Sequence, residues 1–94
     1  MKCLEIINLR ASGDVRELFN PEMTKLFNRI SQLNGLIEFK LFFHAFVSND
    51  LAVHLLWDTE AIDPRGSPLG RQLVQILRDF GLTNYNLWKE EERK

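Results

Sequence analysis

The apolar residues of this chain recur at two spacings, and each spacing predicts its own kind of element. The segment 3–10 is rich in isoleucine and leucine and too short for a globular helix, which predicts a first strand. Apolar residues three or four apart then predict a helical stripe, and the Asn20-Pro21 pair within it is a typical helix start. The stripe predicts either one kinked helix or a short turn leading into a main helix over 21–33. Its apolar positions are Val15, Phe19, Met23, Leu26, Ile30 and Leu33.

Two runs of alternating apolar and polar residues, 37–47 and 51–58, predict a β-hairpin. The alternating apolar residues carry odd numbers in both runs. The numbers of paired residues must then have an even sum, which requires an odd number of loop residues. A three-residue loop at 48–50 meets this condition and gives a sum of 98. The predicted pairs on the second face of the hairpin are Lys40 with Asp58, Phe42 with Leu56, and His44 with His54.

The rest of the chain predicts a loop over 59–66, one more helix and one more strand. Ser67-Pro68 supplies an N-cap and a first-turn proline, and the apolar stripe that follows ends at Gly81. A last strand is predicted over 84–89, followed by a solvated tail over 90–94. The order of elements predicts an α+β class, ferredoxin-like βαββαβ fold: a four-stranded antiparallel sheet with two helices on one face.

Composition and charge narrow the class of protein. The 94 residues suit one domain spanning 1–94, and 45% hydrophobic and 27% charged residues suit a folded chain. The net charge of −1 gives no electrostatic footprint for nucleic acid. A single cysteine, Cys3, excludes an internal disulfide and suits a reducing compartment. Because no apolar run is long enough for a signal peptide or a membrane span, the chain is predicted to be cytoplasmic.

One face of the predicted sheet has no helix to cover it, and yet it is not polar. A solvated sheet face normally carries polar residues, whereas this one mixes aromatic and aliphatic residues with charges and histidines. An apolar patch of this kind usually marks an interaction site. The predicted partner is the same face of a second copy, giving a homodimer. The face is predicted to hold Phe42, Phe46 and Leu56 among Lys40, His44, His54 and Asp58, with either Ile7 and Leu9 or Trp88 beside them.

The order of elements and several segments resemble the dimeric α/β-barrel superfamily, which includes the antibiotic-biosynthesis-type monooxygenases. These segments are EFKLF (38–42), AVHLLW (52–57), SPLG (67–70) and DFGL (79–82). The resemblance implies that two sheets meet face to face and enclose a pocket for an aromatic or polyketide-like substrate. Haem-degrading members use a histidine on a helix as iron ligand, whereas both histidines here lie on predicted strands. No cofactor and no catalytic residue is therefore carried over from the superfamily.

The pair of His44 and His54 is the sharpest candidate for chemistry. Cross-strand neighbours have Cβ atoms about 4.5–5.5 Å apart, close enough to share a proton or a metal. Two ligands do not make a zinc site, and the sequence does not fix the positions of the nearest acids, Glu5 and Asp58, so no metal is predicted. The favoured interpretation is a pair of histidines hydrogen-bonded in a dimer interface. The alternative is contact with a ligand or transfer of its proton.

Three other features have both a structural and a functional interpretation. Lys40 opposite Asp58 predicts a cross-strand ion pair, which inside a barrel would also orient a polar ligand. The segment 66–71 offers backbone amides and an arginine at a helix start, where an anion could bind, but simple helix capping is the favoured interpretation. Trp57 belongs to the helix-facing residues and is predicted to lie in the core.

The leading hypothesis from the sequence is a homodimeric α/β-barrel protein that binds a small, partly apolar or aromatic molecule at its sheet face. A cofactor-free monooxygenase acting on a phenolic or quinone substrate is its enzymatic version, in which a histidine takes a substrate proton. The alternative is a non-catalytic structural or regulatory dimer with a packed interface and no pocket. The sequence does not decide whether the protein is an enzyme. The predicted ligand-binding residues are Lys40, Phe42, His44, Phe46, His54, Leu56 and Asp58.

Overall fold

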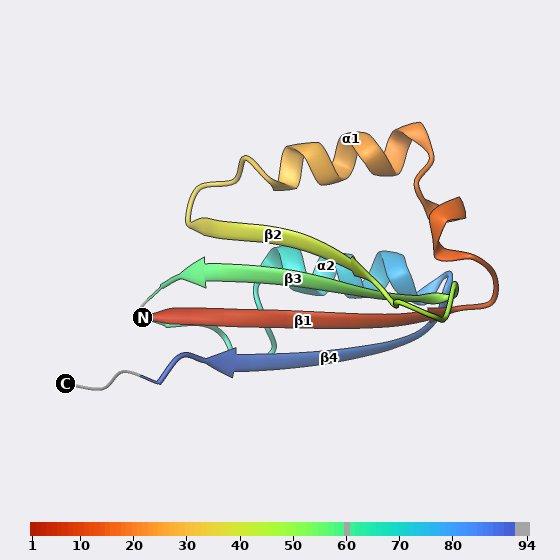
Figure 1. Cartoon of the computed structure of the whole chain (residues 1–94). Coiled ribbons are helices and arrows are strands. Elements are labelled where there is room, and N and C mark those ends of the chain that lie inside the picture. The colour runs from red at the N-terminus through yellow and green to blue at the C-terminus, as the bar shows by residue number, and fades with distance from the viewer. Residues whose placement is uncertain (60, 92–94) are drawn as a thin grey trace.

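A computed structural model of the chain describes residues 1–59 and 61–91, so the end of the predicted tail, 92–94, lies outside the described residues. The strands form one antiparallel sheet in the order β2-β3-β1-β4, which makes β1 and β3 central (Figure 1). The predicted class and order of elements are confirmed. The elements are β1 (Lys2–Ala11), a 3-10 helix η1 (Val15–Leu18), α1 (Pro21–Ile30), β2 (Leu36–Phe43), β3 (Asp50–Asp58), α2 (Pro68–Arg78) and β4 (Gly81–Lys89).

The hydrophobic core lies between the sheet and its two helices. Odd-numbered residues of the central strands point toward the helices, and several of them, such as Ile7 and Val53, are fully buried. Phe27 of α1 and Leu73 of α2 belong to the same apolar cluster, so both helices cover the same face of the sheet, as predicted. Among the described residues, neither helix has the length and apolar character needed to cross a membrane.

The structure decides between the two alternatives predicted for the side chains beside Phe42 on the uncovered face. Ile7 and Leu9 are buried on the helix side, so their predicted place on the uncovered face is wrong. Ile6 lies on that face instead, and so does Trp88, the other predicted candidate. The physical reason is Glu5, a buried charged residue that shares the phase of Ile7 and Leu9 and hides the alternation of the strand.

The first helical stripe is divided at Asn20, which confirms the alternative of a short turn followed by a main helix. The Asn20 side-chain oxygen accepts a hydrogen bond from the Met23 N–H at 2.9 Å, as an N-cap does. Helix α1 ends at Ile30, three residues before the predicted end at Leu33, because the N–H groups of Gln32 and Leu33 bond three residues back instead of four.

The register of the β2–β3 hairpin differs from the prediction, although its faces do not. Lys40 lies opposite His54 and Phe42 opposite Ala52, so paired numbers add to 94 rather than 98. The predicted pairs Lys40–Asp58, Phe42–Leu56 and His44–His54 are therefore wrong. The predicted parity holds because the last pair of the ladder, Phe43 with Leu51, also encloses an odd number of residues, 44–50.

Hydrogen bonds within the loop explain the longer connection. The His44 Nδ1 atom accepts hydrogen bonds from the N–H groups of Phe46 and Val47, each at 3.1 Å. The Ser48 carbonyl accepts another from the Val15 N–H at 2.9 Å. Residues 44–48 thus bond within the loop, to η1 and to Asp50, the first residue of β3, so the regular ladder ends at Phe43.

The turn from α2 into β4 brings two backbones close together. Helix α2 ends at Arg78, and Gly81 is the first residue of β4 rather than the end of the helix. Gly81 pairs with Ala11 of β1, and a Cβ atom at position 81 would overlap the Arg10 carbonyl oxygen. Only glycine allows this approach without moving a central strand.

We expect Gly81→Ala to lower the free energy of unfolding by about 2–3 kcal/mol, because the new methyl group must displace backbone rather than a flexible side chain. Urea denaturation followed by circular dichroism measures the change. Gly13→Ala is the matched control, since its Cβ would meet only a Glu17 side-chain oxygen at 3.8 Å, an ordinary contact. Equal stability of the two variants would contradict the close approach at Gly81.

Candidate functional site

The face of the sheet without helices, called the open face below, is a grid in which strand pairing aligns residues across β2, β3, β1 and β4. One end row holds three apolar side chains, and each of the other rows mixes apolar side chains with amide, charged or histidine side chains. The four rows are Glu38, Leu56, Leu4 and Trp88; Lys40, His54, Ile6 and Asn86; Phe42, Ala52, Asn8 and Asn84; and His44, Asp50, Arg10 and Leu82.

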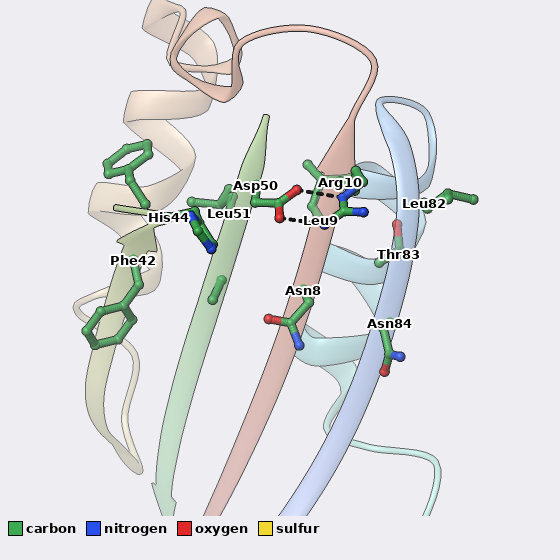
Figure 2. Close-up of a pocket in the computed structure, with 12 residues that line it drawn as sticks. Asn8, Leu9, Arg10, Phe42, His44, Asp50, Leu51, Leu82, Thr83 and Asn84 are labelled. Atoms are coloured by element: carbon green, nitrogen blue, oxygen red, sulfur yellow. Dashed lines mark hydrogen bonds and ion pairs between the residues drawn. The ribbon is translucent and has the colours of Figure 1, made fainter. Parts of the chain in front are cut away.

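A hollow of about 660 Å³ lies on the open face at the end opposite Trp88. Figure 2 shows Phe42 and His44 on one side of it, Asn84 and Leu82 on the other, and the polar groups of β1 and β3 between them. Its walls thus combine aromatic and aliphatic carbon with carboxamide and charged groups. This combination is typical of sites for small molecules that are apolar over most of their surface and polar at a few atoms.

An ion pair crosses the floor of the hollow. The Arg10 guanidinium donates two hydrogen bonds to the Asp50 carboxylate, each at 2.9 Å (Figure 2). This side-chain hydrogen bonding lowers the pKa of Asp50 and raises that of Arg10. The charges of Arg10 and Asp50 therefore neutralise each other within the hollow.

The structure brings together part of the predicted site. Lys40, Phe42 and His54 are neighbours on the open face, and the ring centroids of Phe42 and His54 are 4.6 Å apart. His44 lines the hollow, but it lies two rows from His54 rather than opposite it. Leu56 belongs to the open face, in the row beyond His54.

Two of the predicted residues lie elsewhere. Phe46 sits in the loop after His44 with 94% of its surface exposed. Asp58 lies beyond the far end row, with its carboxylate 3.6 Å from the N-terminal amino group. Asp58 therefore forms no ion pair with Lys40, whose amino group instead lies 3.5 Å from the Glu38 carboxylate.

Burial lowers the pKa of His54 below the ordinary value near 6.5, and the nearby positive charge of Lys40 lowers it further. The imidazole is therefore neutral at pH 7, with one nitrogen able to accept a proton.

Sequence reasoning missed a second polar cluster, centred on Glu5 on the helix side of the sheet. Glu5 is fully buried, and both of its oxygens accept two hydrogen bonds. Oε1 accepts from the Trp57 indole N–H at 2.6 Å and the Ser67 hydroxyl at 2.5 Å. Oε2 accepts from the Ser67 N–H at 3.0 Å and the Tyr85 hydroxyl at 2.5 Å. The one signal in the sequence was the place of Glu5 among the buried odd-numbered residues of its strand.

This cluster also explains the start of α2. The Ser67 hydroxyl caps the helix by accepting a hydrogen bond from the Gly70 N–H at 2.8 Å, while the Ser67 N–H is donated to Glu5. The chain's own carboxylate thus occupies the place where an external anion was considered, and its charge suits the positive end of the helix dipole. The predicted helix capping is confirmed. Trp57 faces the core side, as predicted, and its indole N–H is taken by Glu5.

A smaller cleft of about 370 Å³ lies beside this cluster. Trp57, Ile62 and Pro68 give it apolar walls, and Arg71 lies at its edge with one N–H donated to the Gly66 carbonyl at 2.8 Å. Within residues 1–59 and 61–91, no group of three or more histidine, cysteine, aspartate or glutamate side chains is placed to hold a metal ion.

We expect Glu5→Gln to lower the free energy of unfolding by about 3 kcal/mol, because the amide NH₂ would face two of the four buried donors. Urea denaturation measures the change. Glu90→Gln is the control, since Glu90 is exposed and its one hydrogen bond uses its backbone N–H. A loss below about 0.5 kcal/mol in Glu5→Gln would contradict the role given to the carboxylate.

Tyr85 provides an optical test of the same network, because it is the one tyrosine of the chain. Burial raises its pKa above the ordinary value of 10, and the hydrogen bond to Glu5 raises it further. The folded state favours the protonated phenol, so this contribution to stability is complete below pH 10 and is lost as the pH rises above it.

Ultraviolet absorbance of tyrosinate should therefore appear only well above pH 10, or together with alkaline unfolding. In Glu5→Gln it should appear at a lower pH than in the unmodified protein. A normal titration near pH 10 in the folded protein would contradict the buried hydrogen bond.

Comparison with known proteins bears on the fold. No model of a known protein family matches the sequence, and no curated protein matches it. Among solved structures, the chain is similar to a mutant of SnoaB, a cofactor-independent oxygenase from Streptomyces nogalater. The TM-score is 0.70 over 98% of this chain and 95% of that one, at 13% sequence identity. The chain therefore shares the fold of SnoaB, which confirms the predicted resemblance at the level of the ferredoxin-like fold.

Proposed function

We propose that this protein is a homodimer, joined through the open faces of its two sheets, that binds a small aromatic and partly polar molecule in the hollow of that face. The observation that carries the proposal is the hollow itself, which combines an aromatic wall with hydrogen-bonding groups on a face that no helix covers. Its volume of about 660 Å³ falls in the range of small-molecule sites, roughly 300–1,000 Å³.

The end row of the open face supports the dimer. Leu56, Leu4 and Trp88 lie side by side across three strands, with Ile6 in the next row. Trp88 is 58% exposed in the single chain, an unusual position for a tryptophan without a partner. A second copy would cover this row and leave the hollow at the other end for a ligand.

The walls of the hollow indicate the class of ligand. Phe42 is 47% exposed and offers a ring face for stacking. Asn8 and Asn84, opposite each other on β1 and β4, offer amide donors and carbonyl acceptors. An aromatic molecule with hydroxyl or carbonyl groups would satisfy both kinds of wall, whereas a pure hydrocarbon would offer no acceptor to the amide N–H groups of Asn8 and Asn84.

The chemistry we propose for this site is oxygenation without a cofactor, and the fold shared with SnoaB supports it. A phenolic substrate with an activated CH₂ group supplies the electrons: R₂CH₂ and O₂ give R₂C=O and H₂O. One oxygen atom enters the substrate and the other leaves as water, so no external reductant is needed. Neutral His54, beside the hollow and in contact with Phe42, would take the phenolic proton that makes the substrate electron-rich.

Native mass spectrometry of the purified protein, under gentle and denaturing conditions, tests subunit number and bound ligand together. We expect a dimer that carries extra mass, lost on denaturation, because the hollow is large enough to retain a small molecule. A dimer without ligand that also fails to bind a panel of naphthols and hydroxynaphthoquinones would favour the packed, non-catalytic interface. A monomer at all concentrations would exclude the proposed dimer.

Variants separate binding from chemistry. Phe42→Ala should weaken the binding of a ligand found in this way by roughly tenfold or more. Leu33→Ala should not weaken it, because Leu33 is an exposed apolar residue outside the hollow. His54→Gln should retain binding and lose most oxygen consumption. Unchanged oxygen consumption in both His54→Gln and His44→Gln would contradict the proposed proton transfer.

A further inference from the structure

Phe46 is a large apolar side chain that no other part of the described chain covers. Its ring is 94% exposed, the highest exposure among the large hydrophobic residues described. Exposed aromatic rings of this kind are enriched at the centres of protein interfaces, where they enter pockets of the partner. The residue therefore needs an explanation other than the core of its own chain.

The loop that carries Phe46 is held in place on both sides. The His44 Nδ1 atom accepts the Phe46 N–H at 3.1 Å, and the Ser48 carbonyl accepts the Val15 N–H at 2.9 Å. Asn49 is bonded to Ala11 through its backbone carbonyl, at 2.8 Å, and through its side-chain amide, at 3.2 Å. The loop thus presents the ring to solvent in a defined position.

The hollow of the open face lies next to this loop. His44 lines the hollow and also packs edge-on against Phe46, with ring centroids 6.4 Å apart. Leu82, on the opposite side of the hollow, is 77% exposed (Figure 2). A protruding ring and an apolar hollow thus lie side by side at one end of the sheet.

Such a surface can complement a copy of itself. When a protrusion and a cavity are adjacent, a two-fold axis between two copies places each protrusion in the cavity of the other and closes the assembly at two subunits. Charge favours the same partner. The charged residues of the four rows form two ion pairs, Arg10 with Asp50 and Glu38 with Lys40, so two identical faces meet without net repulsion.

We propose that, in the homodimer, Phe46 of each subunit enters the hollow of the other and forms one wall of its ligand site. This inference rests on the dimer of the proposed function and adds that each site is incomplete without a residue from the partner subunit. The aromatic ring would face Phe42 across the hollow, so that a planar ligand would lie between rings from two subunits.

The dimer dissociation constant of Phe46→Ala, measured by sedimentation velocity over a dilution series, tests the contribution of the ring. We expect the dissociation constant to increase by roughly tenfold or more, because each dimer loses two buried aromatic side chains. Leu33→Ala, another exposed apolar residue in the segment between α1 and β2, should leave the constant unchanged. Since Phe46 is almost fully exposed in the single chain, Phe46→Ala should keep the far-ultraviolet circular dichroism spectrum of the unmodified protein.

Disulfide trapping tests the position of the ring. A mixture of Phe46→Cys and Leu82→Cys chains should form a linked dimer under mild oxidation, whereas each variant alone should not; native Cys3 is buried and does not compete. A linked dimer of Phe46→Cys alone, or an unchanged dissociation constant in Phe46→Ala, would overturn this inference and leave the dimer standing. A monomeric unmodified protein would overturn the dimer as well.

Discussion

One buried carboxylate, that of Glu5, joins the elements of this fold. It belongs to β1, which is paired on both sides, and its donors come from β3, from the start of α2 and from β4. A carboxylate removed from water costs several kcal/mol unless its oxygens are satisfied, and four hydrogen bonds satisfy them here. Loss of any donor leaves a buried charge less well bonded, so the three elements hold one another in place.

The hydrogen bonds to Glu5 also distinguish the two sides of the sheet. On the helix side, the indole of Trp57, the hydroxyls of Ser67 and Tyr85 and the backbone N–H of Ser67 are all bonded to Glu5. Their hydrogen-bonding capacity serves the fold and is not offered to a ligand. On the open face, Asn8 and Asn84 point away from the core beside a hollow, where a ligand can use their donors and acceptors. The two sides of one sheet thus divide the structural and the proposed functional roles.

The sequence predicted which side of the sheet each residue faces more accurately than it predicted which residues pair across strands. Alternation with a period of two residues fixes which side of β3 holds Val53 and which holds His54, so the open face was predicted correctly on that strand. Register depends on where a strand ends, and here His44 stops β2 by bonding backbone groups in its own loop. Alternation carries no information about such a bond. For the same reason the partners of Glu5 were not predicted, because Ser67 and Tyr85 reach it only after distant segments have folded.

The size of the chain and the ion pairs of the open face both support the proposed homodimer. A domain of this length buries only roughly 60–65% of the surface that its unfolded chain exposes. Burial of apolar side chains such as Leu4 and Trp88 against a second copy would therefore add stability that a single copy lacks. A basic or acidic partner would gain little from a face whose charges already neutralise one another. A second copy gains the apolar contacts and meets no net charge of its own sign, because Arg10 is paired with Asp50 within each subunit. The pairing of charges within one sheet thus supports the proposed homodimer over a strongly charged partner.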